Sequence, residues 1–420
     1  MRVRGSPAAS PNRMCQCLAG AGVARVAQEP AQDQLGYTSL LHSLTVMDEA
    51  GRVVIVGGGI LGTMHAVIAR RRGLAVTHLE REQEARGASV RNFGLVWVSG
   101  RRAGPELALA LRARELWESI AADAPGTGFR PAGSLTIAST EAELAVMREA
   151  AGLSDAKQRE FEVLSTDDVR EVNPALRGEF LGGLWCRADA IVEPRVALPT
   201  LRAWLASPGG PGYEWLPGRE AVEVAANGVR DQLGRWHRGD LVVLCTGANF
   251  TGIAGPHLAG SGGTGLRRVR LQMLQTLPFP GRLATSVADG DSLRYYPAYD
   301  VPSLASLPPQ AAVAAENRAQ LLMVQRLDGS LTIGDTHEYD EPFPFDVDED
   351  AYVHLVARAS ALLGTELPRV QRRWAGVYSE VTGTAALYHR STVKPGVVLV
   401  TGPGGRGMTC SPAIAEETFL

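Results

Sequence analysis

The chain has 420 residues, of which 45% are hydrophobic, 21% charged and 6% aromatic, and its formal net charge is -3 at pH 7. This length suffices for two or three domains that bury a core without disulfides or metals, and the composition is that of a folded globular protein. The small net charge argues against nucleic acid and anionic membranes as partners, and no apolar run approaches the ~20 residues of a membrane-spanning helix.

Glycine and cysteine usage narrows the choice further. The 47 glycines in an otherwise average composition predict many tight turns, or loops in which the backbone approaches a ligand. The five cysteines are odd in number and scattered, and no two of them form a Cys-x-x-Cys pair. We therefore expect neither a disulfide framework nor a metal site, and a reducing, cytoplasmic location.

The first 46 residues differ from the rest of the chain. Residues 1–28 contain four arginines and no acidic residue, and they show no clear hydrophobic period. Residues 19–26 form too short and too interrupted a stretch for a secretory signal. We expect residues 1–46 to be a disordered extension, or to reflect a start codon assigned too far upstream, with Met47 as the working start.

From Arg52 onward, strand-like and helix-like segments alternate. Residues 52–56 predict a strand, residues 61–72 a helix and residues 75–79 a second strand, which together make a βαβ unit. Two further helices and seven further strands are predicted. The helices cover residues 106–122 and 141–151, the latter with Thr140 as its N-cap, and the strands cover residues 134–138, 221–224, 241–245, 269–277, 321–324, 331–333 and 397–401. This interleaving predicts two domains threaded through each other, one that binds a nucleotide and one built on an antiparallel sheet.

The first predicted strand runs directly into a Gly-x-Gly-x-x-Gly pattern that opens the first predicted helix. Gly57 permits a tight turn, Gly59 lets the backbone approach a pyrophosphate, and Gly62 lets helix and strand pack closely. Glu80 ends the second strand and follows Gly62 by 18 positions (80 minus 62), close to the spacing of a ribose-binding acid. The pattern therefore predicts a dinucleotide cofactor at the helix N-terminus, where free N–H groups favour phosphate.

Three more segments follow in a characteristic order: Arg86–Gly94, Asp240–Ala248 and Gly402–Thr409. With the glycine motif, they resemble the D-amino-acid-oxidase-like superfamily of FAD-dependent amine oxidoreductases, over about residues 52–417. In that superfamily, a Gly-x-Ser loop touches the pyrophosphate and flavin, and a terminal glycine-rich loop faces the flavin ring. A plain NAD dehydrogenase would leave the terminal loop unexplained.

The resemblance implies FAD, which we expect to be bound non-covalently because no cysteine lies between Cys245 and Cys410. It also implies which residues contact the cofactor. These are Gly57, Gly59, Ile60, Leu61, Gly62, Glu80, Arg81, Ser89, Asn92, Phe93, Gly94, Val224, Gly247, Gly404, Gly405, Gly407, Met408 and Thr409.

The implied fold is α/β, with a Rossmann-like FAD-binding domain interleaved with a substrate-binding cap domain on an antiparallel sheet. We expect the FAD-binding domain to comprise residues 47–130, 186–250 and 370–420. The cap domain then comprises residues 131–185 and 251–369.

Arginines are the candidates for holding an anionic group of the substrate, because a guanidinium grips a carboxylate or phosphonate with two parallel hydrogen bonds. Arg326 lies in a segment that resembles the glycine and sarcosine oxidases, whose arginine at this position pairs with the substrate carboxylate. A surface arginine at a hairpin turn is an equal alternative. Alternation along residues 268–272 places Arg270 on a polar face with Arg268, which could line an anion pocket or be solvated. Arg294 and His337 complete the expected substrate-pocket residues.

Four short segments are similar to the FAD-dependent oxidoreductases associated with phosphonate catabolism: Gly62–Ala66, Ser89–Gly94, Arg270–Met273 and Gly334–His337. This resemblance implies oxidation of an aminophosphonate such as N-methyl-2-aminoethylphosphonate. A hydride would pass to flavin N5, the imine would hydrolyse to an aldehyde, and oxygen or another acceptor would reoxidise the flavin. The alternatives are a glycine, sarcosine or D-amino acid oxidase and, from another class, a flavin-binding protein without turnover.

Overall fold

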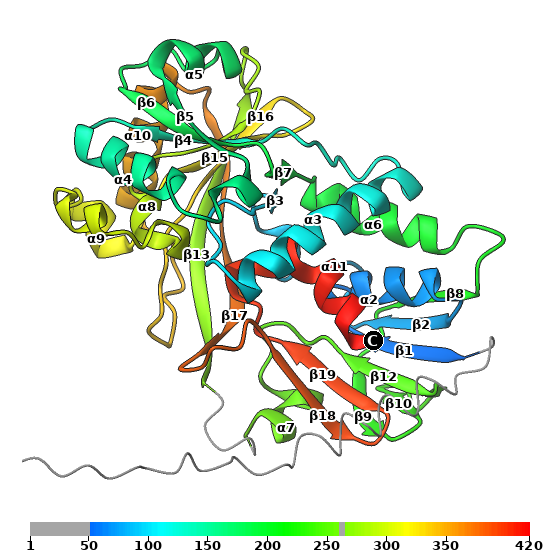
Figure 1. Cartoon of the computed structure of the whole chain (residues 1–420). Helices are drawn as coiled ribbons and strands as arrows, with labels where there is room; N and C mark the ends of the chain where they lie inside the picture. The colour runs from blue at the N-terminus through cyan, green and yellow to red at the C-terminus, as the bar shows by residue number, and fades with distance from the viewer. Residues whose placement is uncertain (1–50, 260–264) are drawn as a thin grey trace, which may run out of the picture.

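A computed structural model describes residues 51–259 and 265–420 of the chain. The expectations for residues 1–46 and for Met47 lie outside the described residues. Figure 1 shows two sheets joined by long connections, with the C-terminal helix packed among helices from the first part of the chain.

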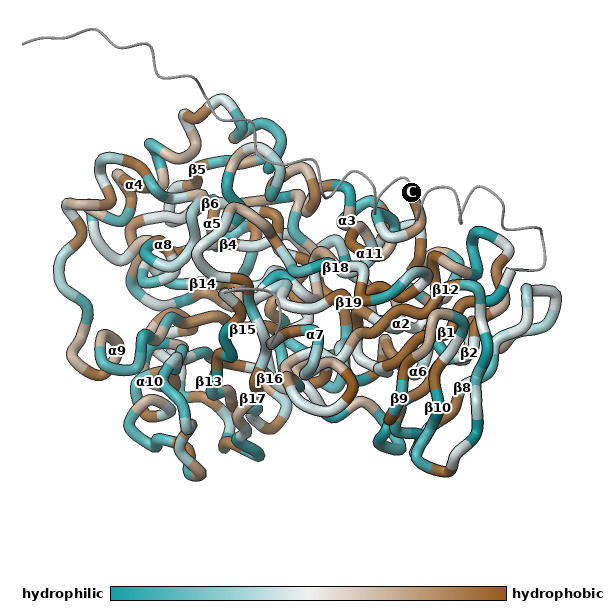
Figure 2. The backbone as a smooth tube through the Cα atoms, turned by 90° about the horizontal axis from the view of Figure 1, so that it is seen from below, coloured by the Kyte–Doolittle hydropathy of each residue, from teal (hydrophilic) through white to brown (hydrophobic). Residues whose placement is uncertain are grey.

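The first sheet has six strands in the order β18-β19-β12-β1-β2-β8, all parallel except β18. Their bounds are β1 Arg52–Val56, β2 Ala75–Glu80, β8 Tyr213–Pro217, β12 Leu241–Leu244, β18 His389–Lys394 and β19 Val397–Thr401. Apart from Arg52 and Thr401, its central strands β1, β12 and β19 are apolar, as their hydrophobic colour in Figure 2 shows. A parallel sheet that is buried on both faces requires such continuous apolar runs.

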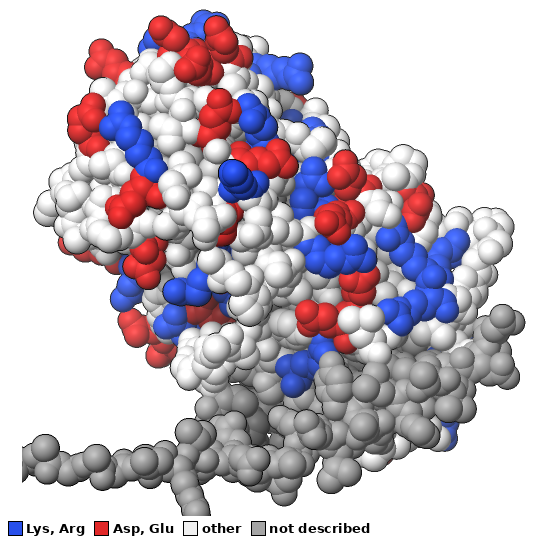
Figure 3. Space-filling model, in the orientation of Figure 1, with Lys and Arg blue, Asp and Glu red and all other residues white. Residues whose placement is uncertain are grey.

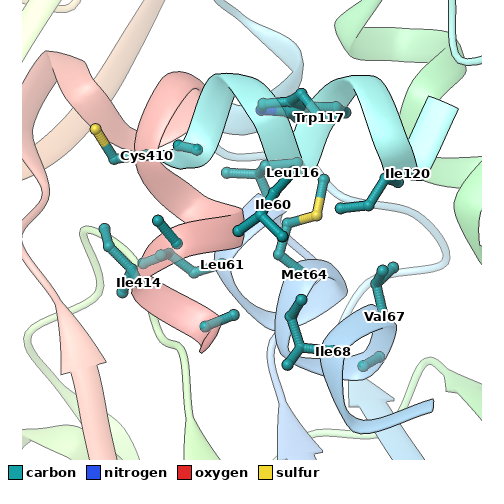
Figure 4. Packing of buried hydrophobic residues seen from close by; sticks show 14 of the residues in the cluster. Ile60, Leu61, Met64, Val67, Ile68, Leu116, Trp117, Ile120, Cys410 and Ile414 are labelled. Atoms are coloured by element: carbon teal, nitrogen blue, oxygen red, sulfur yellow. The ribbon is translucent and has the colours of Figure 1, made fainter. Parts of the chain in front are cut away.

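The two faces of β1 pack into different layers. Val53 and Ile55 face a core shared with four helices, whereas Val54 and Val56 face a core shared with a three-stranded sheet. The helices are α2 Ile60–Arg71, α3 Pro105–Asp123, α6 Pro194–Leu205 and α11 Gly407–Thr418, and the small sheet contains β9 Ala221–Ala225, β10 Gly228–Asp231 and β11 Trp236–Arg238. Figure 4 shows Met64 of α2, Trp117 of α3 and Ile414 of α11 in the helix-side core. This packing holds α2 and α11 against each other.

The second sheet has eight strands in the order β17-β13-β16-β15-β14-β4-β6-β5, and all neighbours are antiparallel except β14 and β4. Their bounds are β4 Ser134–Ala138, β5 Phe161–Ser165, β6 Gly182–Cys186, β13 Gly265–Pro278, β14 Ser286–Ala288, β15 Leu322–Gln325, β16 Ser330–Gly334 and β17 Val370–Thr382. Alternate residues serve its two faces, as the period of a strand requires. Met323 and Ile333 pack in one core with α10 Glu349–Leu363, while Leu322 and Val324 pack in another with Phe93.

The remaining elements are short connections. The strands β3 Leu95–Val96 and β7 Ala190–Ile191 pair with each other. The helices are α4 Glu141–Ala151, α5 Thr166–Val172, α7 Gly255–Ala259, α8 Ser292–Tyr295 and α9 Ala312–Asn317. The 3-10 turns are η1 Ala88–Val90, η2 Ala156–Arg159, η3 Gly252–Ala254, η4 Pro297–Tyr299, η5 Pro302–Ser306 and η6 Gly404–Arg406. No helix among the described residues is long and apolar enough to cross a membrane. Figure 3 shows acidic and basic side chains interspersed over one face of the molecule.

The predicted α/β fold with one parallel and one mostly antiparallel sheet is confirmed. The strands 52–56 and 397–401 have their predicted bounds, and Thr140 caps α4 through a capping box with Glu143. The strand β17 was not predicted, because its exposed polar residues hide the alternation. It pairs with β13 in the second sheet although residues 370–420 were expected in the FAD-binding domain. The domain boundaries as a whole stay predictions.

Candidate active site

A cavity of about 810 Å³ is lined by residues from both sheets. One part of its wall follows the carboxyl ends of β1, β2, β12 and β19, which is where open α/β sheets bind their ligands. The other part comes from β13, β15 and β17 of the second sheet and from α8. A ligand in this cavity would therefore touch the loops that follow the first sheet and the second sheet at once.

The turn between β1 and α2 and the first turn of α2 each have one position with room only for glycine. Gly57 has φ +111°, and a Cβ added there would lie 2.2 Å from the carbonyl oxygen of Cys245. A Cβ on Gly62 would lie 1.9 Å from the carbonyl oxygen of Gly57, so this residue sets the close approach of helix to strand. The first N–H of α2, that of Ile60, donates to Ser89 Oγ at 2.9 Å.

Glu80 holds its carboxylate at the edge of the same turn. One oxygen accepts from the N–H of Gly58 at 2.7 Å and the other accepts from the N–H of Glu82 at 3.0 Å. Each carboxylate oxygen keeps further acceptor capacity, since two lone pairs are present on it. The side chain is therefore fixed at the cavity with acceptor capacity for a hydroxyl-bearing ligand.

The opposite wall is the terminal glycine-rich loop that leads into α11. Thr409 fixes it, because its Oγ1 accepts from the N–H of Trp97 at 2.9 Å and donates to the carbonyl of Leu95 at 3.2 Å. Gly405 has open space where a Cβ would stand. The N-termini of α2 and α11 thus both border the cavity, and their free N–H groups favour a negatively charged ligand.

Four buried polar atoms of the cavity wall lack a hydrogen-bond partner among the described residues: Trp97 Nε1, Thr246 Oγ1, Gln320 Oε1 and Arg406 Nε. Buried polar groups are normally satisfied, so orphaned donors and acceptors along a cavity point to a polar ligand. Together with the glycine turn and the placed carboxylate of Glu80, they fit a dinucleotide that spans the cavity.

Most of the residues expected to contact the cofactor line this cavity. They are Gly57, Gly59, Ile60, Leu61, Glu80, Arg81, Ser89, Asn92, Phe93, Gly247, Gly404, Gly405, Gly407, Met408 and Thr409. Gly62, Gly94 and Val224 do not: Gly62 packs against the turn, and a Cβ on Gly94 would lie 2.1 Å from the carbonyl of Val192. Val224 is buried in the core under the small sheet, and Ala221 lines the cavity in that region instead.

The far end of the cavity is formed by tyrosines and by acceptors from the second sheet. Tyr295 and Tyr378 bring their hydroxyl oxygens within 3.5 Å of each other, and the ring of Tyr295 lies 4.2 Å from that of His337. Asp335 and Gln320 line the same end and are nearly fully buried. Burial raises the pKa of the Asp335 carboxyl above its ordinary value, and the nearby His337 opposes that rise.

The structure brings His337 to the cavity but not the three arginines expected to anchor an anion. Arg326 is enclosed: its guanidinium donates to the carbonyls of Phe93 at 2.7 Å and Asn92 at 3.0 Å, and to Thr332 Oγ1 at 2.7 Å. Burial lowers the pKa of Arg326 to about 10. It lines a separate, smaller cavity of about 260 Å³.

Arg270 and Arg294 are likewise engaged elsewhere. Arg270 is buried and binds both oxygens of Glu338, at 2.5 and 2.6 Å. Arg294 points toward the surface, where it donates to the carbonyl of Pro308. Of the predicted polar stripe, Arg268 is the residue that lines the cavity, and its guanidinium pairs with the carboxylate of Glu341. Among the four arginines considered as anchors for an anionic group, Arg268 is therefore the candidate that can reach a ligand in the cavity.

Sequence reasoning did not single out Gln320, Asp335 or Tyr378 as site residues. Asp335 lies in the segment Gly334–His337, which is similar to the phosphonate-associated oxidoreductases, so a sequence pattern does point to this region. Gln320 carries no signal of its own, and its backbone pairing with Asp335 places it at the cavity. Tyr378 ends the segment Arg373–Tyr378, which also resembles the superfamily, and the pairing of β17 with β13 holds this segment in the second sheet.

The cysteine thiols of the described chain are all free and buried. Cys245 lines the cavity, and its sulfur lies 3.8 Å from His65 Nδ1. Burial raises the pKa of Cys245, and it raises that of Cys410 to about 11. Both thiols therefore remain protonated and poorly nucleophilic near neutral pH.

A parallel sheet with a glycine-rich turn, a carboxylate fixed beside that turn and a second sheet across the cavity form the arrangement expected of a dinucleotide-dependent oxidoreductase. A family model described as FAD dependent oxidoreductase (DAO) matches residues 52–419. The chain therefore belongs to the DAO family of FAD dependent oxidoreductases, and its cofactor is FAD.

Two relatives found by sequence and one solved structure are similar to this chain. An opine oxidase component of Rhizobium meliloti is 33% identical over 148 residues, which make up 33% of this chain and 40% of that protein. D-amino-acid oxidase of Streptomyces coelicolor is 31% identical over 164 residues, 38% of this chain and 45% of that protein. Both matches span less than half of the relative. The glycine oxidase structure from Geobacillus kaustophilus superposes with a TM-score of 0.68 at 18% identity, covering 87% of this chain and 93% of that chain, and shares the fold.

Proposed function

We propose that this protein oxidises the C–N bond of a small amine, with non-covalently bound FAD as the hydride acceptor. The observation that carries the proposal is the continuous cavity that runs from the nucleotide-binding loops to an end rich in tyrosine and in hydrogen-bond acceptors. The names of the relatives, an opine oxidase component, a D-amino-acid oxidase and a glycine oxidase, point to the same chemistry.

The residues of the chain would divide the work along the cavity. Glu80 and the glycine turn would hold the adenosine and phosphates, and the loop before α11 would hold the flavin end. Bound FAD supplies the hydride-accepting chemistry, while the protein orients the substrate carbon and limits access of water. Leu271 and Leu322 supply apolar wall between the two ends.

For the substrate, we propose an amine that carries an anionic group, with N-methyl-2-aminoethylphosphonate as the first compound to test. The resemblance to phosphonate-associated oxidoreductases motivates it, and Arg268 offers a guanidinium in the cavity wall beside Glu341. A glycine, sarcosine or D-amino acid oxidase would use the same arginine for a carboxylate. Arg268→Gln should therefore raise KM for an amine with an anionic group more than for a simple alkylamine that lacks one.

The test mixes the FAD-loaded protein anaerobically with N-methyl-2-aminoethylphosphonate, sarcosine, glycine, D-alanine and simple alkylamines in turn. Loss of the visible flavin absorption is the readout. Reduction by at least one amine, with release of the matching aldehyde or keto acid, is the expected result. Flavin that no amine in the panel reduces, although dithionite reduces it, would favour a flavin-binding protein without amine turnover. Repeating the active compound in air and measuring peroxide then separates oxygen from another electron acceptor.

A further inference from the structure

The acceptor-rich end of the cavity holds a buried carboxylate that pairs with no lysine or arginine of the described chain. We propose that this residue, Asp335, assisted by Gln320, receives the ammonium group of the substrate and takes its proton before the C–N bond is oxidised. The proposal rests on the amine oxidation proposed above and assigns the proton acceptor for that reaction.

Gln320 and Asp335 are held together by their backbones and face one cavity. The N–H of Gln320 donates to the carbonyl of Asp335 at 3.1 Å, and the N–H of Asp335 donates back at 2.8 Å. The Gln320 amide also donates to Asp335 Oδ1 at 3.4 Å. This reciprocal pairing fixes both side chains at the same place on the cavity wall.

The pair presents one orphaned amide oxygen and one carboxylate without a lysine or arginine partner among the described residues. Gln320 is 3% exposed and its Oε1 is buried without a hydrogen-bond partner, while Asp335 is 5% exposed. Within the described residues, the ion pair of Asp335 is with His337 alone, at 4.0 Å. A buried carboxylate and an orphaned amide oxygen require a donor, and a cationic N–H group supplies one most strongly.

Aromatic side chains complete this end of the cavity. Tyr295 and Tyr296 pack edge to face with ring centroids 4.9 Å apart, and Tyr378 meets Tyr295 hydroxyl to hydroxyl. The faces of such rings attract cations, and their hydroxyl groups add hydrogen-bonding capacity. Acceptors and aromatic rings together select an ammonium group, whereas an anionic group would be repelled by Asp335.

The titratable groups that face Asp335 come from several elements. Tyr295 and Tyr296 belong to α8 and the residue after it, Tyr378 to β17, and His337 and Tyr339 to the segment after β16. Burial keeps the pKa of every one of these tyrosines above its ordinary value, so none ionises near neutral pH. A base whose own pKa is raised toward the working pH is well matched to accept a proton there.

The proton and the electrons balance in this scheme. The substrate ammonium loses one proton to the Asp335 carboxylate and becomes a neutral amine. A hydride then leaves the carbon beside nitrogen for FAD, which is reduced, and the substrate becomes an iminium ion. Water adds to that carbon, the C–N bond breaks, and the products are an aldehyde and a protonated amine, while Asp335 returns its proton to solvent.

The first experiment measures the rate constant of anaerobic flavin reduction against pH in the holoenzyme, for the wild type, Asp335→Asn and the control Asp340→Asn. Asp340 is an exposed carboxylate five positions away that does not line the cavity. Near neutral pH, Asp335→Asn should reduce flavin about 100-fold more slowly than the wild type. Its rate should recover at high pH, where the amine arrives already neutral, and Asp340→Asn should follow the wild type.

The second experiment measures binding without turnover, using tert-butylamine, whose carbon beside nitrogen has no hydrogen to transfer. Its cation should perturb the flavin spectrum of the wild type and bind Asp335→Asn about 10- to 100-fold more weakly. Gln320→Leu is the second variant, and it should move the apparent pKa of flavin reduction upward, because the Gln320 amide stabilises the charged carboxylate. If Asp335→Asn fails to retain FAD, the Gln320→Leu profile decides the question.

The outcomes separate this proposal from the proposed function. A wild type that no amine reduces at any pH would defeat the amine oxidase itself. A reducible wild type whose pH profile is unchanged in both Asp335→Asn and Gln320→Leu would overturn the role of Asp335 alone. Loss of the pH step in His337→Gln, with the step retained in Asp335→Asn, would also overturn it and make the histidine the base.

Discussion

Acid pH should weaken the protein where α2 joins the first sheet, because two fully buried histidines there are held neutral. His65 of α2 has Nδ1 2.7 Å from the carbonyl of Leu61 and Nε2 2.9 Å from Thr418 Oγ1 of α11. His78 of β2 has its Nε2 2.9 Å from the carbonyl oxygen of Gly57, and Gly57 lies in the turn between β1 and α2 that lines the cavity. Burial lowers the pKa of each histidine from 6.5 to about 4.

The sign and size of the effect follow from proton linkage. A histidine whose pKa is lower in the folded protein binds fewer protons there than in the unfolded chain, so stability falls as pH drops from 6.5 toward 4. Lowering the pH from about 7 to about 5 should therefore cost about 2 kcal/mol for each histidine. The buried carboxyls of Asp189, Asp289 and Asp335 have raised pKa values and act in the opposite direction. A comparison with histidine variants is needed to remove their contribution.

The assay is urea unfolding, followed by tryptophan fluorescence, for the wild type, His65→Gln and His78→Gln at the two pH values. Each variant should be less stable than the wild type at neutral pH, because buried hydrogen bonds are lost. This difference should shrink by about 2 kcal/mol at the acid pH. His354→Gln, at a partly exposed histidine, is the control and should change less. Differences that are equal at both pH values for both buried histidines would refute the reasoning.

Three further substitutions test single contacts. Gly57→Ala should abolish FAD retention, since the added Cβ would lie 2.2 Å from the carbonyl of Cys245; a purified variant with one FAD per chain would contradict this. Glu80→Gln should weaken FAD binding about tenfold in a fluorescence titration of the deflavinated protein, and an unchanged Kd would argue against the ribose contact. Arg326→Met should lower the free energy of unfolding by roughly 3 kcal/mol without changing KM, because two buried carbonyls lose their donor. A large rise in KM at unchanged stability would restore Arg326 as a substrate anchor.

Much of the fold could be predicted because its signals are local. The apolar run 52–56, the glycine turn after it and the Thr140 cap each act within a few residues, and the structure has the strand and the capped helix at these positions. The nucleotide end of the cavity follows from the same local patterns. In contrast, β17 was missed, since its partner β13 lies about a hundred residues earlier in the chain and its exposed residues follow no simple period.

The substrate end depends on contacts that no local pattern reveals. Arg326 precedes a hairpin turn that the sequence predicts to be solvent-exposed. Its guanidinium nevertheless donates to the carbonyls of Asn92 and Phe93, which lie more than 200 positions earlier in the chain. Gln320 and Asp335 meet because they flank the paired strands β15 and β16, Gln320 just before β15 and Asp335 just after β16. The sequence shows which arginines, tyrosines and acidic residues are available for this end of the cavity. It does not show the strand pairing that decides which of them reach the cavity.

The central claim is that one cavity holds FAD and an amine so that the amine reduces the flavin. The most direct measurement is an anaerobic titration of the purified, FAD-loaded protein with N-methyl-2-aminoethylphosphonate, sarcosine and simple alkylamines, read at the visible flavin band. We predict complete reduction by about one equivalent of the preferred amine, since FAD takes up one hydride, with formation of the matching aldehyde. Flavin that stays oxidised with every amine, and is reduced only by dithionite, would contradict the claim.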